Sequence, residues 1–262
     1  MPDQVKYTNK LQGARVLLIG GSSGIGFGVA EAVVEQGASK VIVVSSRKAR
    51  VDSAIERLKK AYPSSRAEIT GYACDLSNES TINSTIKELF EKTGELDHIV
   101  YSAGDTPPLY NFEDVTLDKI KQAGWVRFYG PLLVAIHGRK KLVQSPKSSL
   151  TITSGATSEN PWKGSIVPSS WLAGLQGMTR SLALEIAPLR VNLVSIGGVE
   201  TEMWDYQDPK TRQATIDELV RDTTLGVIGK VEDVAEAYIY CMKDHFITGS
   251  LISSNGGRFL VN

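Results

Sequence analysis

The 262-residue chain contains only two cysteines and no long apolar run. Cys74 and Cys241 stand far apart and lack the close spacing of metal ligands, so the sequence predicts neither a disulfide framework nor a metal site. No apolar run approaches the roughly 18 residues that a membrane-spanning helix needs. The segment Met1 to Lys10 is polar and has no apolar signal core, so we expect a cytoplasmic protein without membrane contact.

An excess of charge of either sign is also missing, because 29 Lys and Arg residues balance 29 Asp and Glu residues. A strongly basic balance would favour nucleic acid or an acidic membrane as a partner, and none exists here. The composition therefore favours a small-molecule substrate and excludes nucleic acid as the expected partner.

What the chain does contain is a regular alternation of short β-branched runs and helical patterns, which is typical of parallel βαβ units. Strands are predicted at 15–19, 40–44, 68–73, 98–102, 149–153, 190–196 and 250–253, and helices at 27–36, 53–62, 79–92, 117–142, 169–187 and 231–243. This order predicts an α/β Rossmann-type fold. Its doubly wound parallel seven-stranded sheet carries helices on both faces within a single domain, residues 1–262. The segment 197–229 interrupts the alternation, and we interpret it as an insertion that covers the substrate.

The junction between the first strand and the first helix reads Ile-Gly-Gly-Ser-Ser-Gly-Ile-Gly over residues 19–26. Gly20, Gly24 and Gly26 have no Cβ atoms, so a diphosphate can approach the backbone, and the helix N-terminus offers free N–H groups and a positive dipole end. The alternative interpretation is a tight βα turn that binds no ligand. The strand-turn-helix context favours nucleotide binding.

The end of the second strand indicates which nucleotide is bound. Dinucleotide folds specific for NAD place an acidic residue there, whereas this chain has Ser46 and Arg47. The planar guanidinium of Arg47 suits a 2′-phosphate, and Ser22 and Ser23 in the glycine loop add hydroxyl donors. We therefore predict NADP(H) as the cofactor. In the alternative interpretation Arg47 belongs to a solvated helix start.

Several further motifs accompany the glycine loop: Asp75 after the third strand, Ser102-Ala103-Gly104 after the fourth, Ser154 after the fifth, and Gly197-Gly198-Val199-Glu200-Thr201 after the sixth. With them the chain resembles the short-chain dehydrogenase/reductase family over nearly its whole length. The resemblance implies cofactor contacts from Gly20, Ser22, Ser23, Gly24, Ile25, Gly26, Ser46, Arg47, Asp75, Leu76, Ala103, Gly104, Arg127, Val199 and Thr201.

The catalytic positions depart from the family pattern. Family members use a serine to hold the substrate carbonyl, a tyrosine as proton donor, a lysine beside it and an upstream asparagine. Here the serine is Ser154, and counting from it places Val167 at the tyrosine position and Trp171 at the lysine position. No tyrosine lies between residues 154 and 188, so no shift of the alignment restores the pair. Arg127 replaces the asparagine.

These departures resemble a divergent branch of the family, the reductase/Diels-Alderases of fungal indole-alkaloid pathways, which also carry arginine at the asparagine position and lack the Tyr/Lys pair. The branch implies reduction of an iminium-type carbon, which is already cationic and accepts hydride without a proton donor. Trp162 stands where the branch's cyclases have an aspartate. We expect Arg127 and Ser154 to be the catalytic residues. Trp162, Trp171 and Val167 are predicted to line the pocket, with the alternative that the two tryptophans fill the core.

Three functions remain open from the sequence. The first is an NADP(H)-dependent oxidoreductase of natural-product biosynthesis that transfers hydride without the usual proton donor. The second is a non-redox cyclase or isomerase that uses the same pocket, and the third is a catalytically silent NADP-binding partner or sensor. The long helices at 117–142 and 169–187 match those that pair subunits in the family, so a homo-oligomer, dimer or tetramer, is expected.

Overall fold

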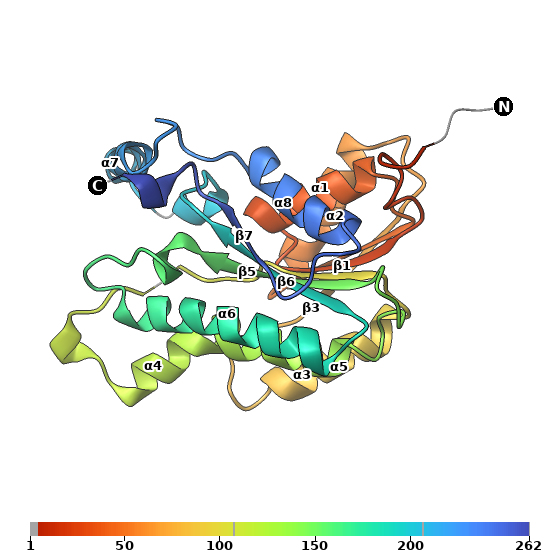
Figure 1. Cartoon of the computed structure of the whole chain (residues 1–262), viewed down its shortest axis with the longest axis horizontal. Coiled ribbons are helices and arrows are strands. Elements are labelled where there is room, and N and C mark those ends of the chain that lie inside the picture. The colour runs from red at the N-terminus through yellow and green to blue at the C-terminus, as the bar shows by residue number, and fades with distance from the viewer. Residues whose placement is uncertain (1–4, 107, 206, 262) are drawn as a thin grey trace.

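The structure, a computed structural model, describes residues 5–106, 108–205 and 207–261. A seven-stranded parallel sheet forms its middle layer, with strand order β3-β2-β1-β4-β5-β6-β7 (Figure 1). The strands are β1 (Arg15–Ile19), β2 (Lys40–Ser45), β3 (Glu68–Ala73), β4 (His98–Tyr101), β5 (Ser149–Gly155), β6 (Arg190–Ile196) and β7 (Leu251–Ser254). The predicted doubly wound Rossmann-type fold is confirmed, and every predicted strand is present within two residues of its expected bounds.

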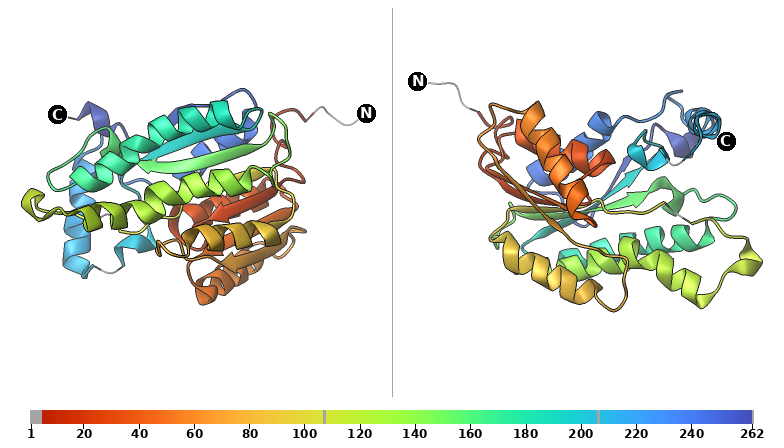
Figure 2. Two further views of the ribbon diagram at one scale, coloured as in Figure 1. Left: turned by 90° about the horizontal axis from the view of Figure 1, so that it is seen from below. Right: turned by 180° about the vertical axis from the view of Figure 1, so that it is seen from behind.

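Helices cover both faces of the sheet (Figures 1 and 2). One face carries α1 (Gly24–Glu35), α2 (Lys48–Ala61) and α8 (Val231–Lys243), and the other carries α3 (Ile82–Thr93), α4 (Leu117–Gly124), α5 (Gly130–Gly138) and α6 (Ile166–Glu185). Two apolar clusters fill the spaces between these layers, one on each side of the sheet. The central strands are buried on both faces, which explains why 16–19 and 41–44 read as continuous apolar runs.

The topology locates the site. The chain leaves β1 toward β2 on one side, whereas β4 pairs with the opposite side of β1. Loops that follow β1 and β4 therefore diverge at the carboxyl edge of the sheet, and open α/β sheets bind ligands at such a switch point. The glycine loop at 20–26 and the Ser102-Ala103-Gly104 segment both lie at this edge.

The helix predicted as one element at 117–142 is divided into three. Between α4 and α5 lies a π-helical segment, η2 (Trp125–Tyr129), and α5 ends at Gly138. The buried hydroxyl of Tyr101, at the end of β4, donates a hydrogen bond to the carbonyl of Val126. This hydrogen bond ties the π-helical segment to the end of β4. Single-turn π segments inside α-helices are frequent at functional sites, and this one carries Arg127.

The segment 197–229 contains the helix α7 (Pro209–Arg221), which was not predicted from the sequence. Asp208 caps it by accepting hydrogen bonds from the backbone N–H groups of Lys210 and Thr211 at 3.0 and 3.1 Å. Proline at the first helical position completes a standard helix start. The segment therefore carries regular secondary structure, at one end of the molecule, and is not an irregular loop (Figure 1).

Within the described residues, no helix is both long and apolar enough to span a membrane.

Candidate cofactor and active site

The glycine loop packs directly against the segment that follows β4. A Cβ atom on Gly20, whose φ is +92°, would lie 2.4 Å from the backbone nitrogen of Ala103. A Cβ on Gly26 would lie 2.3 Å from the Gly20 carbonyl and equally close to the Ser102 hydroxyl. Both positions accept only glycine, because any side chain would push the two loops apart. The structure thus brings together the two motifs that the sequence assigned to cofactor binding.

The serines of the loop have different surroundings. Ser22 is nearly buried, and its hydroxyl donates to that of Ser45 at the end of β2 over 2.8 Å, so it ties the loop to the neighbouring strand. Ser23 is exposed and precedes α1 without forming a side-chain cap. The Ser23 hydroxyl is therefore open to solvent beside the N-terminus of α1, where an anion would bind, while the Gly24 N–H already donates to Glu202.

Arg47 is the exposed residue at the N-cap position of α2, and its side chain has no ion-pair or hydrogen-bond partner among the residues that the structure describes. The adjacent Lys48 is engaged with Asp52 one turn along the helix. Ser46 is exposed beside Arg47. Of the two neighbouring cations, Arg47 is consequently the one available to a phosphate.

The remaining predicted cofactor residues occupy the same edge. Asp75 is exposed and accepts from the Ser77 backbone and hydroxyl at 3.0 and 2.8 Å, which shapes the turn after β3, while Leu76 is buried below it. Thr201 lies against Gly24 across the loop: a Cβ on that glycine would stand 3.2 Å from the threonine methyl. Val199 is buried under this segment.

Arg127 is held across the segment that follows β4. Its Nε donates to the Asp105 carboxylate at 3.1 Å, and its Nη2 donates to the Asp105 carbonyl. A Cβ on Gly104 would stand 3.0 to 3.1 Å from the guanidinium, so the planar group lies flat on this glycine. Burial lowers the pKa of Arg127 from its ordinary value, and the Asp105 carboxylate opposes that shift. The result is a fixed, partly desolvated cation beside the cofactor cradle.

The Ser154 hydroxyl is turned into the protein. It is 2% exposed and donates to the carbonyl of Leu172 on α6 over 3.2 Å. Donation to a substrate would require this hydrogen bond to be exchanged. Val167 is 5% exposed and offers no titratable atom. Tyr101 is not a substitute acid, because burial raises its pKa and its hydroxyl is already bound.

Trp171 belongs to an aromatic cluster between α4, η2 and α6. Its ring centroid lies 4.6 Å from that of Phe128 and 5.4 Å from that of Tyr129, and its indole N–H donates to the Ile120 carbonyl over 2.9 Å. These contacts agree with the alternative interpretation, in which Trp171 fills the core. Trp171 is half-buried, and its assignment to the substrate pocket stays a prediction.

Trp162 has a different position. It is 42% exposed, and the Arg258 guanidinium from the C-terminal segment lies 5.0 Å from its ring centroid. Arg258 also pairs with Asp222, just after α7, at 3.4 Å. An exposed aromatic face beside the segment 197–229 is compatible with a pocket rim, and this assignment stays a prediction.

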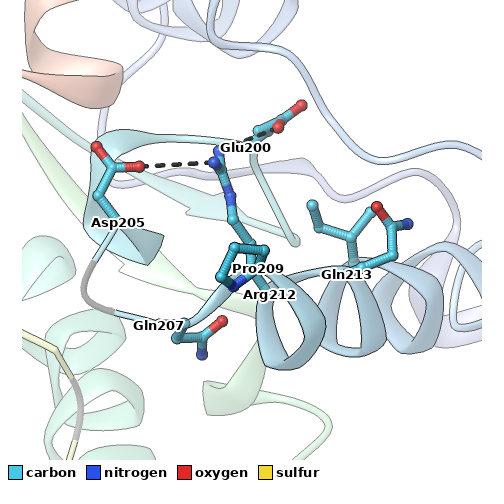
Figure 3. A pocket seen from close by; sticks show the side chains of 7 residues that line it. Glu200, Asp205, Gln207, Pro209, Arg212 and Gln213 are labelled. Atoms are coloured by element: carbon cyan, nitrogen blue, oxygen red, sulfur yellow. Dashed lines mark hydrogen bonds and ion pairs between the residues drawn. The ribbon is translucent and has the colours of Figure 1, made fainter.

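A polar cavity of about 460 Å³ lies within the segment 197–229 (Figure 3). Arg212 of α7 crosses it toward two carboxylates, reaching Glu200 at 3.2 Å and Asp205 at 3.7 Å. The lining residues are Glu200, Asp205, Gln207, Pro209, Arg212, Gln213 and Ile216. These ion pairs connect the start of the segment to α7 across the cavity.

Two residues at this edge were missed from the sequence. Asp105 directly follows the Ser-Ala-Gly motif, and Glu202 directly follows Thr201. Each stands next to a motif that had been assigned to the cofactor, and this adjacency was the available signal. Their partners, Arg127 and the Gly24 backbone, come from distant parts of the chain, so the contacts themselves could not be read from spacing.

Comparisons with known proteins agree with this geometry. A family model described as an SDR-like Rossmann domain matches residues 7–261. The short-chain dehydrogenase/reductase fsr5 of Gibberella fujikuroi is 46% identical over 97% of this chain and 98% of its own length. The short-chain dehydrogenase/reductase malC of Malbranchea aurantiaca is 35% identical over 95% of this chain and 96% of its own length.

Solved structures show the same relationship. The MalC reductase/Diels-Alderase from Malbranchea aurantiaca matches with a TM-score of 0.90 at 34% identity, covering 97% of this chain and 99% of that one. A small-chain dehydrogenase in complex with NADPH matches with a TM-score of 0.76 at 26% identity, covering 94% and 99% of the two chains. The resemblance drawn from the sequence motifs is confirmed.

Proposed function

This chain belongs to the short-chain dehydrogenase/reductase family, and we propose that it is an NADP(H)-dependent oxidoreductase of natural-product biosynthesis with a non-standard active site. The observation that carries the proposal is a contrast within one site. The cofactor cradle leaves no room for a Cβ atom at Gly20 or Gly26, while positions 167 and 171 hold a buried valine and a tryptophan packed against Phe128.

The cradle fits NADP(H) through residues of this chain. The loop 20–26 and the start of α1 would hold the diphosphate, and Arg47 with Ser46 would hold the 2′-phosphate of the adenosine ribose. Asp75 and Leu76 would flank the adenine, and Ala103, Gly104, Val199 and Thr201 would contact the nicotinamide half. The bound cofactor supplies the hydride. A neighbour that holds NADPH in its solved structure supports this choice of cofactor.

The missing proton donor restricts the substrate. Reduction of a ketone leaves an alkoxide that must be protonated, and neither valine nor an indole does this. Reduction of an iminium-type carbon leaves a neutral amine and needs no proton. We therefore assign to the protein a substrate that already carries its positive charge, and the similarity to the MalC reductase/Diels-Alderase supports a related chemistry.

The Arg127–Asp105 pair would set the electrostatics of this site. The Asp105 side chain is 51% exposed, so its second carboxylate oxygen is open to a ligand, whereas the Arg127 side chain is 16% exposed and fixed. Arg127 would orient the cofactor or an anionic oxygen of the substrate. Ser154 would contact the substrate only after its hydroxyl leaves the Leu172 carbonyl.

The test follows the absorbance of NADPH while purified protein is mixed with NADPH and either a cyclic iminium compound or a ketone of matched size. The proposal expects consumption with the iminium and a rate at least about a hundredfold lower with the ketone, since general acid catalysis typically contributes 10²–10⁴-fold. Equal rates with both substrates would contradict it.

A non-redox cyclase is the second candidate, favoured by the similarity to the MalC reductase/Diels-Alderase. It predicts product formation from a diene and dienophile pair without NADPH consumption, through proximity and orientation. Binding of NADPH without turnover of either class would favour the third function, a silent NADP-binding partner. Under each of these functions we propose a cytoplasmic homo-oligomer that pairs through α4–α5 and α6.

A further inference from the structure

A carboxylate of the chain itself lies at the anion-binding end of α1. The backbone N–H of Gly24 donates to Oε2 of Glu202 at 2.7 Å. The guanidinium of Arg57, from α2, stands 3.6 Å from Oε1 of the same carboxylate. Glu202 therefore receives a helix N-terminal donor on one oxygen and a cation on the other, which are the two kinds of partner that a phosphate takes in such a cradle.

The two partners come from independent elements and are themselves positioned. Arg57 lies over the ring of Phe27 in α1, with its Cζ atom 3.8 Å from the ring centroid, so its guanidinium is fixed beside the start of that helix. Thr201, next to Glu202, packs against Gly24 and accepts a hydrogen bond from the Met203 backbone at 3.4 Å. The carboxylate is thus held in place from its own side as well.

We infer that Glu202 is an internal latch: its carboxylate occupies the diphosphate subsite of the cradle and leaves when the cofactor binds. The inference rests on the proposed function, because it assumes a cofactor with a diphosphate. One N–H cannot serve two anions at the same position, and a carboxylate left beside a diphosphate would repel it. Entry of the cofactor therefore requires Glu202 to move out and transfers Arg57 from the carboxylate to the incoming phosphate.

Movement of the latch also affects the substrate side. Glu202 opens the short helix η4 (Glu202–Trp204), and the residues on either side of η4, Glu200 and Asp205, are both paired with Arg212 of α7. Release of Glu202 frees this segment from α1 while the Arg212 pairs keep it attached to α7. Cofactor binding and the position of the segment 197–229 are coupled in this way.

The latch has a quantitative consequence for affinity. When a protein binds its ligand only in an open state, the apparent Kd equals the intrinsic Kd divided by the open fraction. A latch closed about four-fifths of the time raises the apparent Kd about fivefold. Removing the charge of Glu202 should therefore tighten cofactor binding, which is the opposite of what removing a ligand-binding residue does.

The experiment measures Kd for NADPH and for inorganic pyrophosphate in the wild-type protein, in Glu202→Gln and in Glu202→Ala. Glu56→Gln is the matched control: it removes the same charge from an exposed residue next to Arg57 whose side chain makes no hydrogen bond or ion pair within the described part of the chain. We expect both Glu202 variants to bind NADPH and pyrophosphate at least about fivefold more tightly. The control should change less than twofold, and adenosine 2′-monophosphate, which lacks a diphosphate, should bind all four proteins equally.

Equal or weaker binding of pyrophosphate by folded Glu202 variants, checked by circular dichroism, would overturn the latch. Tighter binding by Glu56→Gln to the same degree would overturn it too, because the effect would then be general electrostatics. Loss of NADPH binding in every protein would refute the proposed function separately, since the pyrophosphate measurement reports on the latch without the nucleosides.

Discussion

Replacement of Arg47 by alanine should change the cofactor preference rather than the affinity for nucleotides in general. Arg47 is exposed at the start of α2 and is unpaired among the residues the structure describes, so its guanidinium is available to a 2′-phosphate. A hydrogen bond to a charged group contributes about 1.5–3 kcal/mol, and we take the lower end because the site is open to water. The loss of about 1.4 kcal/mol corresponds to a tenfold increase in the Kd for NADPH.

The measurement is the pair of dissociation constants for NADPH and NADH, obtained from the fluorescence of the reduced nicotinamide. In Arg47→Ala the Kd for NADH should stay within twofold of wild type, so the ratio of the NADPH Kd to the NADH Kd rises about tenfold. Lys48→Ala is the control, because that ammonium is already engaged by Asp52. The reasoning is refuted if both cofactors weaken equally, or if the lysine variant changes the ratio as much as the arginine variant.

Three further predictions concern the packing of the cradle and of the sheet. Gly26→Ala would place a methyl 2.3 Å from the Gly20 carbonyl, so it should cost about 1–3 kcal/mol of stability and weaken NADPH binding at least tenfold. Gly177→Ala, with no atom within 4 Å of the new methyl, should leave binding intact; equal effects in titration calorimetry would count against the cradle. Burial lowers the pKa of His98 to about 3, whereas in the unfolded chain its imidazole takes up a proton near pH 6.5. The unfolded state therefore binds more protons between these values, and the free energy of unfolding falls as the pH decreases from 6.5 toward 3. Urea unfolding of wild type should lose about 2 kcal/mol more than His98→Gln between pH 7.5 and 5.0, and parallel losses would contradict this assignment. Arg190 is 3% exposed and donates to the carbonyls of residues 146, 147, 241 and 242, so Arg190→Met should cost about 3 kcal/mol or more in the same assay; a loss below about 1 kcal/mol would show that the carbonyls find other donors.

The cofactor half of the site could be predicted from the sequence because its physics is local. A glycine loop between a strand and a helix exposes backbone donors through the conformation of a few consecutive residues, and Gly20 and Gly26 are required by contacts within the first βαβ unit and its neighbour. The absence of a carboxylate at Ser46 and Arg47 is likewise visible in a single short stretch.

The substrate half could not be predicted in the same way, because its residues acquire their roles from distant partners. Trp171 is one example, because its contacts with Phe128 and Tyr129 exist only where α6 packs beside η2. The helix α7 was missed although Asp208 and Pro209 mark its start. Its residues are mostly polar, and a helix with a weak apolar face is stabilised chiefly by its cap and its tertiary contacts.

The sequence by itself therefore determined the fold class, the position of the cradle and the loss of the Tyr/Lys pair, since each is a property of residue identity and short-range spacing. Only the tertiary structure decided that Asp105 restrains Arg127, that the Ser154 hydroxyl points to Leu172, and that Glu202 reaches Gly24 from 178 positions away. The physical reason is the range of the forces involved. Backbone conformation is set by neighbours in the chain, whereas the charge and hydrogen-bonding state of a site depend on every element that the fold brings within a few ångströms of it.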